Sequence, residues 1–153
     1  MITLEIAEGF RSLIDSRPVE CAVEAALQHQ SATQNADLTI VITGDEQIHD
    51  LNRQFRGVDA PTDVLSFPAG HTDPESGSLY LGDVLISYPR ASAQAERGEH
   101  SVADEIQLLV VHGTLHLLGH DHASPDEKTK MWAAQAEILR ELGIEDLGVA
   151  NGE

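Results

Sequence analysis

Cysteine, aromatic residues and positive charge are all scarce in this sequence. The single cysteine, Cys21, excludes an intramolecular disulfide and a thiol-ligated zinc site. Aromatic residues make up only 4% of the chain, which argues against a broad stacking platform for single-stranded nucleic acid. Lysine and arginine number 9 against 26 aspartates and glutamates, giving a net charge of −17. Such a surface repels bare nucleic acid and anionic lipid, so a polyanionic substrate would need a local basic site or a carrier that presents it.

Long apolar runs are missing as well. The longest strongly apolar run extends from Leu108 to Val111, which is far too short to cross a bilayer. The first residues carry neither the basic region nor the apolar core of a signal peptide. With 153 residues, 41% of them apolar, the chain has the size and composition of one domain with its own core. We therefore expect a single domain over residues 1–153 that lies in the cytoplasm and has no membrane partner.

The order of apolar and polar residues predicts an α+β fold. Strands are expected over 2–6, 37–43, 63–67 and 79–87, with Pro68 ending the third strand and Gly82-Asp83 interrupting the fourth. Helices are expected over 19–30, 45–56, 89–98 and 101–118, and from a capping box at 124–127 through residue 142. Because helices and strands interleave irregularly, we expect a small mixed sheet of about four strands packed by helices.

Three histidines stand close together at the end of the most apolar segment, in the stretch HGTLHLLGHDH that begins at His112. His112 and His116 are four residues apart, so on a helix both imidazoles project from one face and can reach a single ion. Gly119 allows the chain to turn out of the helix, and His122 can then return to the same ion. Three imidazoles with one position left for water are typical of a catalytic zinc site. The pattern predicts one Zn²⁺ ion, although Ni²⁺ or Cu²⁺ would also bind such a site.

A single histidine in an apolar helix is more often a hydrogen-bonded core residue, but three at this spacing favour a metal site. His120 alternates with His122 and is expected to point elsewhere, so it is not assigned as a ligand. Asp121 is a candidate acceptor for the ring N–H of a ligand. The remaining histidines are scattered and expected on the surface: His29, His49, His71 and His100.

The spacing of the three histidines also matches that of metzincin proteases. In those enzymes a glutamate follows the first histidine and serves as the general base of peptide hydrolysis. Here that position is Gly113, which has no side chain to accept a proton. The sequence therefore favours hydrolysis of a bond other than the peptide bond.

Together with three further segments, these residues resemble the YbeY family of bacterial rRNA maturation factors, which are similar to single-strand endoribonucleases. The further segments are LNRQFR from Leu51, PTDVLSFP from Pro61 and LGDVLIS from Leu81. The match covers most of the chain from about residue 37 to residue 142. It implies a zincin-like metal helix, processing of ribosomal RNA at the 3′ end of the small-subunit RNA, and a part in ribosome quality control.

The resemblance also implies roles for individual residues. The zinc-binding histidines of the family fall on His112, His116 and His122, and its functionally important arginine falls on Arg56. A guanidinium there would hold the phosphate oxygens on which charge develops during cleavage, although a solvated cation at a helix end is the simpler explanation of Arg56 alone. Further candidates that structural or surface roles also explain are Asp63, Ser66, Asp83, Arg90 and Arg97.

Three functions remain open on these observations. The leading hypothesis is a zinc-dependent endoribonuclease that acts on RNA presented by a ribosomal particle, with help from a protein partner. The second is a non-catalytic ribosome-assembly factor stabilised by its metal, which a fourth protein ligand such as Asp121 or His120 would favour. The third is a zincin-type hydrolase of peptides or amides, which Gly113 disfavours.

Overall fold

A four-stranded mixed sheet forms the centre of the fold in the computed structural model, which describes residues 1–32 and 35–144. The strands follow the order β1-β2-β4-β3, with β1, β2 and β4 parallel and β3 antiparallel to β4. Their bounds are β1 Ile2–Ile6, β2 Ala36–Thr43, β3 Val64–Thr72 and β4 Leu79–Ser87. This arrangement confirms the predicted α+β fold with a mixed sheet of four strands.

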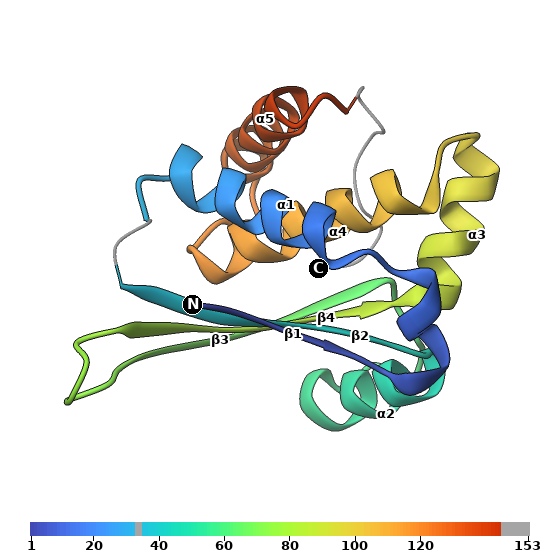
Figure 1. Ribbon diagram of the computed structural model, residues 1–153, viewed down its shortest axis with the longest axis horizontal. Coiled ribbons are helices and arrows are strands. Elements are labelled where there is room, and N and C mark those ends of the chain that lie inside the picture. Colours follow the sequence, from blue (N-terminus) through green and yellow to red (C-terminus); the bar gives the residue numbers. More distant parts are fainter. Residues whose placement is uncertain (33–34, 145–153) are drawn as a thin grey trace.

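The two faces of the sheet are covered unequally (Figure 1). Alternation along β2 directs Leu38, Ile40 and Ile42 into the larger core, and all three are at most 1% exposed. Helices α1, α4 and α5 pack over this face, whereas α2 alone covers part of the opposite face (Figure 1). The helices are α1 Ser16–His29, α2 Asp45–Arg56, α3 Tyr88–Gly98, α4 Val102–Leu117 and α5 Pro125–Glu141.

The hairpin formed by β3 and β4 departs from the predicted strand ends. β3 does not stop at Pro68 but continues to Thr72 after a register shift between Pro68 and His71. A proline is tolerated there because β3 is the edge strand and its missing N–H need not bond a further neighbour. β4 also continues through Gly82, whose φ of +136° suits glycine, and a Cβ there would lie 2.2 Å from the carbonyl oxygen of Phe67. The predicted end of β3 at Pro68 was therefore wrong, whereas the interruption predicted in β4 corresponds to a register shift between Tyr80 and Gly82 within a continuous strand.

The helix ends follow their capping residues. Ser101 and Ser124 each accept a main-chain N–H three residues ahead, at the starts of α4 and α5. α1 begins at Ser16, three residues earlier than predicted, because Asp15 caps it by accepting the N–H of Arg17 at 3.1 Å. The sequence did not predict the short 3-10 helix η1 (Glu8–Leu13) before it.

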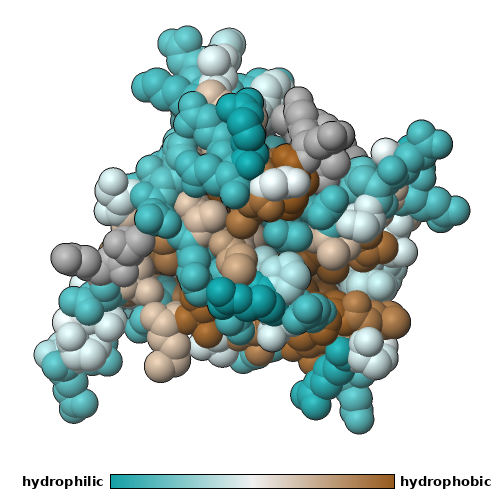
Figure 2. Space-filling view, turned by 45° about the horizontal axis from the view of Figure 1, so that its top comes forward, coloured by the Kyte–Doolittle hydropathy of each residue, from teal (hydrophilic) through white to brown (hydrophobic). Residues whose placement is uncertain are grey.

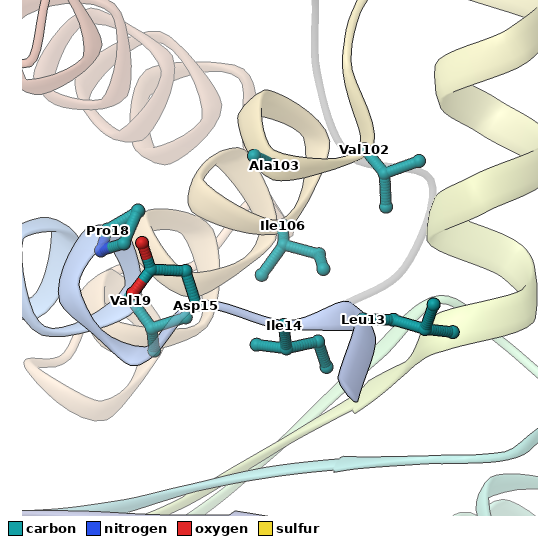
Figure 3. Close-up of a pocket in the computed structure, with 8 residues that line it drawn as sticks. All are labelled: Leu13, Ile14, Asp15, Pro18, Val19, Val102, Ala103 and Ile106. Atoms are coloured by element: carbon teal, nitrogen blue, oxygen red, sulfur yellow. The ribbon is translucent and has the colours of Figure 1, made fainter. Parts of the chain in front are cut away.

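α4 is the most deeply buried helix, and most of its residues from Glu105 to Leu117 are closed to solvent. A cavity of about 50 Å³ lies beside its first turns and is lined by residues such as Leu13, Val19 and Ile106 (Figure 3). Ligand sites occupy roughly 300 Å³ or more, so this apolar space is a packing gap. Within residues 1–32 and 35–144, no helix is long and apolar enough to cross a membrane. Hydrophilic side chains cover most of the face seen in Figure 2.

Candidate metal centre

The three predicted histidines converge at the C-terminal end of α4. His112, His116 and His122 each offer one ring nitrogen, and these atoms lie within 4.8 Å of one another. The ring centroids are 4.9 Å apart for His112 and His116, 5.2 Å for His116 and His122, and 5.9 Å for His112 and His122. A group that is able to hold a metal ion is therefore present.

Local geometry brings the third histidine back to the helix. α4 ends at Leu117, and Gly119 follows with a φ of +101°, a conformation that L side chains rarely adopt. The N–H of Gly119 donates to the carbonyl of His116 at 3.1 Å, and that of His120 donates to the carbonyl of Leu115 at 3.0 Å. The chain thus folds back over the last helical turn, as the glycine at this position predicted.

His112 has a second polar partner deep in the protein. Its Nδ1 lies 2.9 Å from Oε1 of Gln135 on α5, and the two residues are 0% and 2% exposed. Sequence reasoning missed Gln135. The available signal was a polar residue at a core position of the last helix, four residues after Met131 and three before Ile138.

The loop that carries His122 is held by other contacts. The carboxylate of Asp121 accepts the main-chain N–H of His122 at 2.7 Å. Asp121 was predicted to accept the ring N–H of a ligand, but the contact shown is to the backbone. Nε2 of His120 lies 2.7 Å from Oε1 of Gln30 on α1, and His120 is absent from the converging group, as predicted. Burial, with smaller effects of His29 and Lys130, lowers the pKa of His120.

Gly113 lies where α4 crosses the sheet. A Cβ at this position would lie 2.4 Å from Cγ1 of Val84 and 3.2 Å from Oγ of Ser66. The hydroxyl of Ser66 donates to the carbonyl of Gly113 at 3.1 Å. The sheet therefore leaves no room for a side chain here, and a glutamate such as that of the metzincins would not fit without displacing β3 or β4.

Arg56 is placed differently from the histidines. It is exposed at the C-terminal end of α2, on the opposite face of the sheet from α4 (Figure 1). The neighbouring Phe55 packs edge-to-face against Phe67 of β3, with ring centroids 5.7 Å apart. Ser66, the residue before Phe67 in β3, faces α4 and donates a hydrogen bond to the carbonyl of Gly113. Edge strand β3 therefore separates the end of α2 from the metal helix.

The other candidates from the matching segments have structural contacts. Asp63 is 1% exposed and accepts from the side-chain amide of Gln94 at 3.2 Å. Asp83 accepts from the hydroxyl of Tyr80. Ser66 contacts α4 through its hydrogen bond to the carbonyl of Gly113.

Two of the scattered histidines, predicted on the surface, are only partly exposed. The side chains of His29 and His100 are 19% and 14% exposed, and they lie 2.7 Å from Glu137 and 2.6 Å from Glu105. Burial raises the pKa of Glu105, and the nearby His100 partly opposes this shift. His49 and His71 are the more exposed pair, as predicted.

Comparison with known proteins agrees with these features. The family model described as Endoribonuclease YbeY matches residues 12–143. Proteins named Endoribonuclease YbeY from Roseiflexus sp. and Chloroflexus aurantiacus are 42% and 45% identical, over 94% of this chain and 93% and 96% of their own lengths. The solution structure of TM1509 from Thermotoga maritima is similar with a TM-score of 0.57 and 26% identity, and the match covers 94% of this chain and 92% of that one.

Proposed function

Since the chain belongs to the YbeY family of endoribonucleases, we propose that it hydrolyses single-stranded ribosomal RNA at a zinc centre formed by His112, His116 and His122. The observation that carries this proposal is the convergence of the three imidazoles at the end of α4. The expected process is maturation of the 3′ end of small-subunit rRNA, together with ribosome quality control, in the cytoplasm.

The residues present fit a zinc ion. Gln135 occupies Nδ1 of His112, which leaves Nε2 of that ring for a metal. Nε2 of His116 is buried, so it lies away from bulk solvent. Three nitrogen donors match the ligand type and number of catalytic zinc sites, which keep a fourth position open. Mg²⁺ and Ca²⁺ prefer oxygen donors and fit this group poorly.

The ion and the chain would contribute differently to the reaction. When bound, zinc supplies a Lewis acid that polarises a phosphoryl oxygen and lets water react as a nucleophile near neutral pH. The chain contributes no carboxylate at position 113, where even a Cβ would lie 2.4 Å from Cγ1 of Val84. This absence separates the proposed reaction from the peptide hydrolysis of the metzincins, which requires a glutamate at that position.

Arg56 is proposed to bind the RNA phosphate. Its guanidinium can donate two parallel hydrogen bonds to the oxygens of one phosphate of the bound RNA strand, away from the bond that is cleaved. Phe55 packs against Phe67 of β3, and the residue before Phe67, Ser66, donates a hydrogen bond to the carbonyl of Gly113 on α4. An RNA strand that passes the edge of β3 would therefore meet Arg56 on one side and the histidines on the other.

The charge of the chain favours RNA that is presented by a ribosomal particle. With a net charge of −17, the protein can neutralise few phosphates, so its affinity for bare RNA is expected to be weak and to fall steeply with salt. A ribosomal particle and a protein partner would bind and position the RNA, a task that an extended basic surface performs in other proteins. Cleavage should therefore be faster on small-subunit particles than on the same RNA in naked form at physiological salt. Equal rates on the two substrates would contradict this part of the proposal.

The central test compares wild-type protein with His116→Ala and Arg56→Ala. Zinc content by atomic emission and cleavage of a small-subunit 3′-end RNA are measured on the same preparations. His116→Ala should lose both zinc and cleavage, because it removes a ligand. Arg56→Ala should keep its zinc and lose cleavage, because it removes a phosphate contact.

Two matched variants control for the loss of a histidine or an arginine. His49→Ala removes a partly exposed histidine of α2 that pairs with Asp59, and Arg140→Ala removes an exposed arginine of α5. Both should keep zinc and cleavage. Cleavage by zinc-free protein at the wild-type rate would refute the metal-dependent mechanism, and zinc binding without any turnover would favour the non-catalytic assembly factor.

A further inference from the structure

The buried contact between His112 and Gln135 joins the metal helix to the last helix of the described chain. Its atoms, Nδ1 and Oε1, lie 2.9 Å apart, and both residues are closed to solvent. A buried primary amide destabilises a core unless its hydrogen bonds are satisfied, and Gln135 occupies a position of α5 flanked by the buried Met131 and Ile138. Apolar packing alone would be served better by leucine or methionine at this position.

The chemistry of the contact determines which ring nitrogen can bind a metal. An amide oxygen only accepts hydrogen bonds, so Nδ1 of His112 carries the proton. A neutral imidazole with its proton on Nδ1 has its lone pair on Nε2. The ring of His112 is 4.9 Å from that of His116 and 5.9 Å from that of His122, between centroids, so it sits within the converging group.

We propose that Gln135 is a positioning residue for the metal centre, which fixes the tautomer and the ring orientation of His112 so that Nε2 is presented to the ion. This inference rests on the proposed zinc centre, but it does not depend on which bond the enzyme cleaves. Groups that hold metal-binding histidines in this way are commonly carboxylates or main-chain carbonyls, and their loss weakens metal binding by about 10–100-fold. Gln135 performs the same task with a neutral side chain.

Because the side chain of Gln135 is a neutral acceptor, substitutions at position 135 can either keep an accepting oxygen or remove it. A glutamate at position 135 would keep an accepting oxygen in the same place and make His112 a more basic ligand. A leucine or a methionine would fill a similar volume and leave Nδ1 of His112 without this acceptor. The two kinds of substitution therefore separate hydrogen bonding from packing.

The test measures Zn²⁺ affinity of the full chain by competition with a chromophoric chelator. Gln135→Leu and Gln135→Met should bind Zn²⁺ about 10–100-fold more weakly than wild type, and Gln135→Glu at least as tightly. Gln107→Leu makes the same change on α4, where the amide bonds the main chain of Ala103, and should leave the affinity unchanged. Wild-type affinity in both apolar variants, or equal weakening in Gln135→Glu, would overturn the proposal.

A second measurement uses the metal-free protein and needs no catalytic activity. Side-chain ¹⁵N NMR above the ordinary pKa of histidine should show His112 with its proton on Nδ1, and Gln135→Met should shift the ring toward a mixture of tautomers. The same mixture in wild type and variant would contradict the proposal. If wild-type protein itself fails to bind Zn²⁺, the proposed metal centre is refuted. If wild type and Gln135→Met bind Zn²⁺ with equal affinity, only the proposed role of Gln135 is refuted.

Discussion

Histidines lie at both ends of helix α4, but their side chains have different kinds of partner at the two ends. At the N-terminal end, His100 pairs with the carboxylate of Glu105 at 2.6 Å. At the C-terminal end, His112, His116 and His122 lie against one another, with ring centroids 4.9 to 5.9 Å apart. Three imidazole nitrogens this close together can share one cation. A histidine beside a carboxylate has a partner within the protein, whereas a group of histidines can bind an external cation.

The polarity of the helix agrees with both arrangements. Asp104 and Glu105 lie in the first turn of α4, and His116 lies in its last turn. The N-terminus of a helix favours negative charge and its C-terminus favours positive charge. A cation bound at the C-terminal end is therefore stabilised by the helix as well as by its ligands.

The largest effect is expected from removing the buried histidine of this end. His112→Ala removes a ring that is 0% exposed and leaves Gln135 without its partner, so the free energy of unfolding of metal-free protein should fall by about 2–4 kcal/mol. His122→Ala changes a half-buried loop residue and should lower it by about 1 kcal/mol or less. Urea denaturation measures both values. Equal losses would show that the histidine on the helix is no more important to the fold than the histidine on the loop.

The next largest effect concerns the contact between α4 and the sheet. In Gly113→Ala the new Cβ would lie 2.4 Å from Cγ1 of Val84, and such overpacking lowers the free energy of unfolding by about 1–3 kcal/mol. Val84→Ala removes the clashing methyl groups, so the double variant should be more stable than the sum of the two single losses predicts. A double-mutant cycle by urea denaturation measures this coupling, and strict additivity would contradict the close approach.

A cap at the other end of α4 gives a smaller effect. Ser101 accepts the N–H of Asp104 at 3.0 Å, and Ser101→Ala should lower the free energy of unfolding by about 1 kcal/mol. Ser101→Asp keeps an acceptor and should retain most of the stability. Thermal unfolding of the two variants measures the difference, and identical melting temperatures would show that the cap is unimportant.

Much of the fold and of the site could be predicted because the determining patterns are local. The spacing of His112 and His116 and the glycine after Leu118 depend on a few neighbouring residues. The end of β3 was not predictable in this way, because Pro68 is tolerated only where the strand lies at the sheet edge. Strand order is a property of the whole fold.

Partners that are distant in the sequence explain the remaining errors. Gln135 is 23 residues from His112, and only the packing of α5 on α4 brings them together. Glu137 is 108 residues from His29, and their side chains lie 2.7 Å apart. The role of Arg56 came from family resemblance alone, since no local pattern relates the end of α2 to the metal helix.

The smallest effect is a change in the pH dependence of stability at the N-terminal end of α4. Burial raises the pKa of Glu105 above its ordinary value of 4.5, and this outweighs the opposing effects of His100 and Arg97. The folded state therefore keeps a proton at pH values where the unfolded chain has lost it, so this contribution to stability is complete below pH 4.5 and is lost as the pH rises through the raised pKa.

Glu105→Gln cannot titrate, so its stability should fall less than that of wild type over this range. Urea denaturation at a series of pH values measures the two slopes, with Glu141→Gln, an exposed carboxyl of α5, as the control. Parallel curves for wild type and Glu105→Gln would show that the folded and unfolded states bind the proton of Glu105 equally well.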